Sequence, residues 1–177
     1  MKVVVINGAP GAGKDAFVQC CQKHCFWCSN VSTVDFVKDV AKFCGWDGTK
    51  TPKDRKFLSD LKKLLGDWSD VPFQKVKQTV KNLETTMTTW DYNPDTDGII
   101  FIHCREPEEI ARFVKELNAI TLLIQRPAVE GQEQSNQSDK EVFNYVYDYM
   151  ICNDQGLAEL ELEAVDFMTN LGIRYLH

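Results

Sequence analysis

The chain has 177 residues, the size expected of a single domain that can bury its own core. Hydrophobic residues make up 44% of the sequence and charged residues 26%, which disfavours a disordered, collagen-like or membrane-embedded chain. The formal net charge of −6 argues against polymeric nucleic acid as a partner bound through a generally basic surface.

Short apolar runs alternate with amphipathic segments along the chain, which predicts alternating strands and helices. The first apolar run, residues 2–6, is β-branched and unalternating, as in a strand buried on both faces of a parallel sheet. The expected elements, in chain order, are a strand at 2–6, a helix at 14–27, a strand at 31–34, a helix at 36–44, helices within 52–90 with breaks at Gly66 and Pro72, a polar connector at 92–98, a strand at 99–104, a helix that begins at Glu106, a strand at 121–124, a strand at 149–152 and a helix at 157–171.

These alternating units predict an α/β fold with three layers, in which helices cover both faces of a five-stranded parallel sheet. Residues 1–177 are expected to form one domain. About residues 50–90 would form a helical insertion within it, and the polar residues 127–139 would form a loop because they have almost nothing to bury. No apolar run approaches the roughly twenty residues of a membrane helix, so no membrane contact is expected.

The cysteine content points to a reducing compartment. Seven cysteines are an odd number for a disulfide framework, and the N-terminus shows no secretory signal, so we expect free thiols in a cytoplasmic protein. Cys25 and Cys28, with His24 beside them, have the spacing of a zinc-ligand pair. Cys21, Cys25 and Cys28 also fit the buried stripe of a helix, so both interpretations stay open.

Between the first strand and the first helix, residues 8–15 read Gly-Ala-Pro-Gly-Ala-Gly-Lys-Asp and match the pattern GxxxxGK. In this context the glycines let main-chain N–H groups converge on an anion, and the helix N-terminus adds partial positive charge. Lys14 would reach the outer phosphates of a nucleoside triphosphate such as ATP. The residues predicted to bind the nucleotide here are Gly8, Ala9, Gly11, Ala12, Gly13, Lys14, Asp15 and Ala16.

Asp15 departs from the general motif, in which Ser or Thr places a hydroxyl on Mg²⁺. A carboxylate can bind the metal directly or through water, but it also brings a negative charge toward the phosphates. Asp15 is therefore the predicted metal ligand, and its mode of binding stays open.

With its GKD variant the sequence resembles the P-loop kinases of small molecules, notably phage-type deoxynucleoside monophosphate kinases and animal-type phosphomevalonate kinases. The resemblance is spread over most of the chain, although residues 52–90 align poorly. The segments that carry it are residues 8–15, Val37-Lys38-Asp39 after the second strand, Arg105 after the third, Gln125-Arg126-Pro127 at the end of the fourth, and residues 152–156 after the fifth.

This resemblance implies a P-loop NTPase fold with ATP and Mg²⁺ as cofactors. It implies that Arg105 and Lys38 hold the phosphoryl acceptor, that Arg126 lies against the adenine and that Asn153 helps to close the base pocket. The loop at 127–139 would be the lid over the phosphates, and it contains no arginine.

Basic residues are concentrated between Lys50 and Lys81, where nine basic and four acidic residues give a net charge of +5. A solvated helical face accounts for this stretch as well as a binding surface for a small anionic substrate does. If it binds substrate, Arg55 is the arginine in the stretch that can add countercharge to the acceptor site.

The end of the third strand departs from the family pattern. An acid that holds the metal is expected there, but His103 and Cys104 precede Arg105. Asp35, after the second strand, either orients or deprotonates an acceptor hydroxyl or acts as the N-cap of the next helix. His103 is assigned no role. The carboxylates that remain nearby are Asp15, Asp35 and Glu106.

Together these features favour an ATP-dependent kinase of a small anionic acceptor, a (deoxy)nucleoside monophosphate or a nucleoside, with Lys14, Arg105 and Asp35 as catalytic residues. The missing acid keeps open an alternative: a nucleotide-binding sensor with little transfer activity. A switch GTPase is disfavoured because no NKxD-like guanine signature follows the fourth strand. The sequence defines neither the acceptor nor the oligomeric state.

Overall fold

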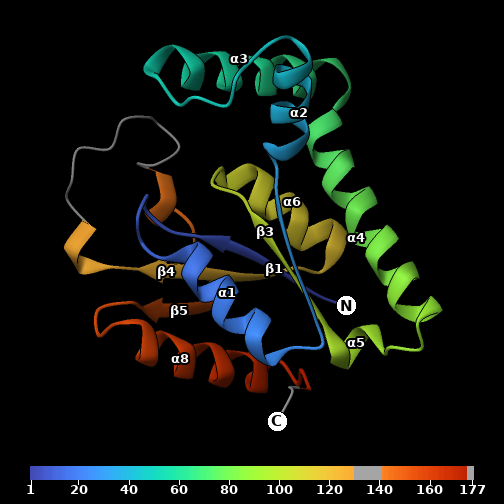
Figure 1. The fold of residues 1–177 in the computed structure, drawn as a ribbon, viewed down its shortest axis with the longest axis vertical. Helices are drawn as coiled ribbons and strands as arrows, with labels where there is room; N and C mark the ends of the chain where they lie inside the picture. The colour runs from blue at the N-terminus through green and yellow to red at the C-terminus, as the bar shows by residue number, and fades with distance from the viewer. Residues whose placement is uncertain (130–140, 175–177) are drawn as a thin grey trace.

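A single parallel sheet with strand order β2-β3-β1-β4-β5 lies at the centre of the computed structural model, which describes residues 1–129 and 141–174 (Figure 1). Every paired strand is parallel to its neighbour, so all the carboxyl ends lie at one edge of the sheet. The strands are β1 (Lys2–Asn7), β2 (Trp27–Ser32), β3 (Gly98–His103), β4 (Ile120–Gln125) and β5 (Tyr149–Cys152).

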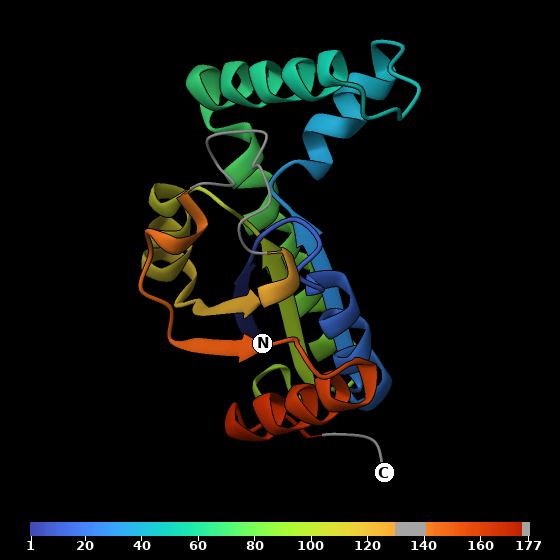
Figure 2. The same cartoon turned by 90° about the vertical axis from the view of Figure 1, so that its left-hand side faces the viewer.

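Helices cover both faces of the sheet, and the side chains of β1 alternate between the two resulting cores. Val4 and Ile6 pack with residues of α1 (Lys14–His24) and α8 (Leu157–Asn170) on one face. Val3 and Val5 pack with residues of α4 (Val71–Thr89) and α6 (Pro107–Leu117) on the other (Figures 1 and 2). The predicted three-layer α/β/α fold with a five-stranded parallel sheet is thus confirmed.

The boundary between α1 and β2 differs from the prediction. The helix expected over 14–27 ends at His24, and the strand expected at 31–34 spans Trp27–Ser32. Cys25 adopts an extended backbone, with φ −113° and ψ 141°, and its thiol donates to the Trp27 carbonyl oxygen. The strand was placed too late in the sequence because β2 pairs only with β3, at the sheet edge, where polar residues are tolerated and no apolar run is needed.

This boundary also corrects the interpretation of the cysteines as a single helical stripe. Cys21 lies on α1, but Cys25 follows the helix and Cys28 belongs to β2. Cys21 and Cys25 are buried and Cys28 is half-buried, and all three thiols are free. They therefore act as small hydrophobic side chains in the core under α1 and α8.

The segment from residue 35 to residue 97 is helical and passes from α2 (Asp35–Phe43) through α3 (Pro52–Ser69) and α4 to the short α5 (Pro94–Asp97). Gly66 lies inside α3 and does not break it, contrary to the prediction. The helix ends at Asp70, which has a left-handed backbone with φ 56°, and Pro72 then opens α4. The predicted connector at 92–98 contains α5, whose N-cap is the Asn93 side chain.

The two long helices of this segment differ in how they are held. α4 buries Phe73, Val76 and Val80 against the sheet, whereas α3 has no buried side chain and lies beyond the end of the sheet (Figure 2).

Of the predicted loop at 127–139, Pro127–Val129 forms a short 3-10 helix, η1, and residues 130–139 lie outside the described residues. A second one, η2 (Glu141–Phe143), follows. Within the described ranges, no helix is long and apolar enough to cross a membrane.

Candidate functional site

The loop between β1 and α1 has a backbone that only glycine adopts easily. Gly8, Gly11 and Gly13 have positive φ angles of 151°, 79° and 99°. A Cβ atom at Gly8 would overlap the carbonyl oxygen of Ile124, and one at Gly13 would overlap the side-chain amide of Asn153. The loop therefore depends on these glycines, and its main chain approaches the ends of β4 and β5 closely.

Lys14 is the first residue of α1, and its ammonium is held by the loop. Its Nζ donates to the carbonyl oxygens of Gly8 at 2.6 Å and Ala9 at 3.0 Å. The loop also bonds to itself, because the Ala12 N–H donates to the Ala9 carbonyl oxygen at 3.1 Å. The structure thus joins the predicted lysine to the predicted glycine-rich turn at the amino end of a helix, where the helix dipole favours an anion.

Asn7 orders this loop, and sequence reasoning missed it. Its buried side chain accepts from the Gly8 N–H at 2.8 Å and donates to the Tyr147 hydroxyl at 2.7 Å and the Arg105 carbonyl oxygen at 3.4 Å. The Tyr147 hydroxyl in turn donates to the Val142 carbonyl oxygen at 2.7 Å. The available signal was a polar residue at the end of a buried apolar strand, since buried amides are retained where they have partners.

A cavity of about 480 Å³ opens on the α8 side of the loop. Arg126 donates to the Gly11 carbonyl oxygen at 3.4 Å, and the Asn153 side chain donates to the Ala12 carbonyl oxygen at 2.9 Å. The structure therefore brings three predicted nucleotide-binding residues, Ala16, Arg126 and Asn153, to one cavity beside the loop. The lining residues are Gly13, Ala16, Arg126, Pro127, Ala128, Asn153, Asp154, Gly156, Leu157 and Leu160.

His103, the last residue of β3, faces the first turn of α1. Its Nε2 lies 3.8 Å from Oδ1 of Asp15, whose side chain is 84% exposed. Burial is the main cause of the lowered pKa of His103, and the positive charges of Lys14 and Arg105 lower it further. The carboxylates of Asp15 and Asp35 raise this pKa but do not outweigh the other effects. The imidazole is therefore mainly neutral near pH 7, and Nε2 is buried without a hydrogen-bond partner in the described part of the chain.

The predicted acceptor residues near β2 lie together. Asp35 begins α2, where its Oδ2 accepts from the Ser32 N–H at 2.7 Å and its Oδ1 lies 3.1 Å from Lys38 Nζ. The N-cap residue of α2 is Val34, so the N-cap interpretation of Asp35 is wrong in detail. Its carboxylate instead binds the N–H that ends β2 and leaves one oxygen to pair with Lys38.

The one contact described for the Arg55 side chain does not connect it to Asp35 and Lys38. Arg55 is exposed on α3, and its Nε donates to the Lys50 carbonyl oxygen at 3.3 Å. Arg105 follows β3 at the carboxyl edge of the sheet, and its main-chain carbonyl oxygen accepts from Asn7. The arginine predicted from the family pattern is therefore at the sheet edge, and the one chosen from the basic stretch lies on a helix that stands away from it.

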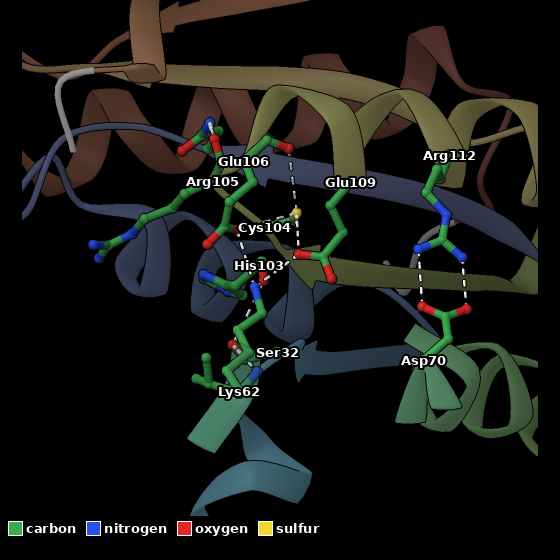
Figure 3. A network of polar contacts seen from close by, with 11 residues as sticks. Ser32, Lys62, Asp70, His103, Cys104, Arg105, Glu106, Glu109 and Arg112 are labelled. Atoms are coloured by element: carbon green, nitrogen blue, oxygen red, sulfur yellow. Dashed lines mark hydrogen bonds and ion pairs between the residues drawn. The ribbon is translucent and has the colours of Figure 1, made fainter. Parts of the chain in front are cut away.

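Glu106 is occupied by a partly buried ion-pair cluster that sequence reasoning did not foresee (Figure 3). Lys62 of α3 reaches Glu106 Oε2 at 3.1 Å and Glu109 Oε2 at 2.8 Å, and the Cys104 thiol donates to Glu109 at 3.2 Å. Burial lowers the pKa of Lys62, but the charges of Glu109 and Glu106 outweigh it, and the net pKa is raised. Lys62 is therefore a countercharge that the two carboxylates share.

Among the described residues, those of this cluster, and not the cysteines near residue 25, lie close enough together to serve as metal ligands. Within the described ranges, one group of three Cys, His, Asp or Glu residues has ligand atoms within 4.8 Å of one another: Cys104, Glu106 and Glu109. The cysteines between residues 20 and 28 form no such group there. Burial raises the pKa of Cys104 well above its usual value, so its thiol is protonated beside the Lys62 ammonium.

Comparison with known proteins yields likenesses of structure only. No protein-family model matches the sequence, and no curated protein matches it. Among solved structures, an APS kinase of Mycobacterium tuberculosis matches with a TM-score of 0.46 and 12% identity, over 95% of this chain and 96% of that one. A dephospho-CoA kinase from Campylobacter jejuni has a TM-score of 0.47 and 14% identity, with coverage of 96% and 97%. A sugar kinase from Janibacter sp. matches with a TM-score of 0.49 and 14% identity, over 96% of this chain and 95% of that one. Likenesses at this level assign no function to this chain.

Proposed function

We propose that the protein is an ATP-dependent phosphotransferase that acts on a small anionic acceptor, most simply a (deoxy)nucleoside monophosphate or a nucleoside. The observation that carries this proposal is the loop at residues 8–13, with its glycine-dependent backbone and with Lys14 bonded into it. A turn of this kind at the start of a helix holds phosphate through N–H groups and a cation. The cavity beside it, between Arg126 and Asn153, has room for a base.

Transfer of a phosphoryl group needs positioning and countercharge more than covalent chemistry. In this proposal Lys14 binds the outer phosphates and Arg105 contacts the acceptor at the carboxyl edge of the sheet. Lys38 and Asp35 lie beside each other at the end of β2, where the cation would bind an acceptor anion. The Asp35 carboxylate, which already accepts from the Ser32 N–H and from Lys38, would orient an acceptor hydroxyl through a remaining lone pair.

A divalent ion such as Mg²⁺ would neutralise the charge that develops on the phosphates. Two observations indicate that residues of this site fit such an ion. Asp15 presents an exposed carboxylate on the first turn of α1, and Nε2 of His103 is a buried nitrogen without a hydrogen-bond partner among the described residues. These two side chains would hold the ion in the proposed site.

A nucleotide-binding sensor with little transfer activity is the second candidate. It is favoured by one observation, namely that β3 ends in His103 and that the next carboxylate along the chain, Glu106, is already paired with Lys62. In this alternative the loop binds ATP in the same way, and binding itself is the signal.

The first experiment asks whether the loop binds ATP. We expect ATP with a divalent ion to raise the melting temperature of the protein, and Lys14→Ala to abolish the rise. The matched control is Lys63→Ala, because Lys63 is a largely exposed lysine on α3, and it should retain the full rise. If no nucleotide shifts the melting temperature of the wild-type protein, both candidates are refuted.

The second experiment separates the enzyme from the sensor. A panel of nucleoside monophosphates, nucleosides and phosphomevalonate is screened for acceptor-dependent ADP release. The enzyme predicts turnover above the Lys14→Ala background for at least one acceptor, and the sensor predicts none. For an active acceptor, Arg105→Ala should raise KM or lower kcat while ATP affinity stays nearly the same.

A further inference from the structure

The starting observation is an unsatisfied nitrogen in the middle of the proposed site. Nε2 of His103 is buried and has no hydrogen-bond partner in the described part of the chain. A buried polar atom left without a partner destabilises the fold, and native proteins keep few such atoms. The neighbouring groups are polar and charged, so the unsatisfied atom indicates a partner that binds there.

The position of this nitrogen limits what the partner can be. Nε2 lies 3.8 Å from Oδ1 of Asp15, which is longer than a hydrogen bond. Two atoms that each bind one metal ion at about 2.1 Å can be no more than about 4.2 Å apart. The observed separation is within this limit, and Asp15 is exposed enough to adjust. The pair comes from β3 and from the helix that follows the phosphate loop.

The other carboxylates in this region are already engaged. Lys62 and the Cys104 thiol hold Glu106 and Glu109 (Figure 3). Asp35 is bonded to the Ser32 N–H and to Lys38. Asp15 is the acidic group that lies within 4 Å of the histidine. The protein ligands of an ion here would therefore be one imidazole nitrogen and one carboxylate.

We infer that His103 Nε2 and the Asp15 carboxylate together bind the divalent ion that accompanies the nucleotide, and that this donor pair favours Mn²⁺ over Mg²⁺. The inference rests on the proposed binding of ATP to the loop. Mg²⁺ is held in proteins almost entirely by oxygen ligands, whereas first-row transition metals also bind imidazole well. Mn²⁺ accepts both carboxylate and phosphate oxygens and the histidine nitrogen, so it suits this mixed set.

The direct test is pulsed EPR of Mn²⁺ bound to the protein with a non-hydrolysable ATP analogue. We expect a nitrogen coupling of a directly bound imidazole, and this coupling should change when the histidines are labelled with ¹⁵N, which separates it from nitrogens of the adenine. His103→Asn should remove the coupling, and His24→Asn should keep it. If the analogue and Mn²⁺ bind but the wild-type protein shows no histidine coupling, the inference is overturned.

A second measurement uses affinity and does not require turnover. With either metal at a concentration that saturates the analogue, we expect the wild-type protein to bind the Mn²⁺ complex about tenfold more tightly than the Mg²⁺ complex. His103→Asp supplies a carboxylate and should bring this ratio close to one. An equal ratio in wild type and variant refutes the role of His103. If the wild-type protein does not bind the analogue with either metal, the proposed function is refuted as well, whereas binding with an unchanged ratio refutes only the role of His103.

Discussion

The glycine-rich loop at residues 8–13 and helix α3 are held in place by different kinds of contact. The loop is fixed by main-chain geometry and by buried amides, namely Asn7 against Gly8 and Asn153 against Ala12. Helix α3 buries no side chain, and Lys62 ties it to α6 through an ion-pair cluster. The comparison teaches that the glycine-rich loop is preformed by packing, whereas the attachment of α3 to α6 depends on charge.

The largest effect is expected from the loop. Gly8→Ala would place a Cβ against the Ile124 carbonyl oxygen and force an unfavourable φ, so we expect a loss of about 3 kcal/mol in the free energy of unfolding. Gly45→Ala is the matched control, because Gly45 also has a positive φ but has open space around it; it should cost about 1 kcal/mol. Urea unfolding measures both. Equal losses would mean that close packing does not hold the loop.

The next effect concerns α3. Lys62→Met removes the cation from two partly buried carboxylates and leaves them without countercharge, which we expect to lower the free energy of unfolding by about 2 kcal/mol. Lys63→Met, at an exposed neighbouring lysine, should change it by less than about 0.5 kcal/mol. Chemical denaturation of the two variants tests this. If they are equally stable, α3 is not held by its charge.

A smaller effect is expected where the loop meets β5. Asn153→Ala removes the hydrogen bond to the Ala12 carbonyl oxygen, and we expect about fivefold weaker ATP binding because one neutral hydrogen bond contributes about 1 kcal/mol. Asn82→Ala, on the exposed face of α4, is the control and should bind ATP as the wild type does. Calorimetry with ATP gives both affinities. An unchanged affinity in Asn153→Ala would separate this residue from the nucleotide site.

The smallest effect is the pH dependence of the ion pair at the end of α3. Hydrogen bonds from Arg112 lower the pKa of Asp70 below its ordinary value of 3.8, so the pair stabilises the fold above that pH and this contribution is lost as the pH falls through the lowered pKa. Both side chains are partly exposed, which limits the contribution to below about 1 kcal/mol.

Asp70→Asn tests this pair and keeps a residue that tolerates the left-handed backbone at that position. We expect the variant to be less stable than wild type at pH 6 and the stability difference to be smaller at pH 2.5, below the ordinary pKa of 3.8, as followed by urea unfolding. A stability difference of the same size at both pH values would show that the charge of Asp70 does not contribute. High salt should also reduce the difference at pH 6.

The features that could be predicted from the sequence are those encoded by neighbouring residues. The GxxxxGK turn is one continuous motif, and β1, β3, β4 and β5 are apolar runs, so each was located correctly or to within about two residues. β2 was misplaced because an edge strand carries polar residues and has no such run. Gly66 was taken as a break although a single glycine costs a helix only about 1 kcal/mol, which α3 tolerates.

The parts of the site that escaped prediction depend on contacts between distant residues. No local sequence pattern predicts which distant residues come into contact. Three such pairs are Asn7 with Tyr147, Lys62 with Glu106, and His103 with Asp15. His103 in particular resembles an ordinary strand residue until its unsatisfied nitrogen and its neighbour are located in space. Sequence reasoning could place the glycine-rich loop but not the side chains that surround it.

The absence of a buried side chain on α3 has a consequence for how this protein can diversify. Substitutions at exposed positions of a helix usually change stability very little, so the exposed positions of α3 can be changed while Lys62, the half-buried Leu58, Leu61 and Leu65, and the two ends of the helix are kept. The surface that α3 offers to solvent is therefore uncoupled from folding of the sheet. For protein engineers, α3 is the place to install new binding preferences without first having to stabilise the scaffold.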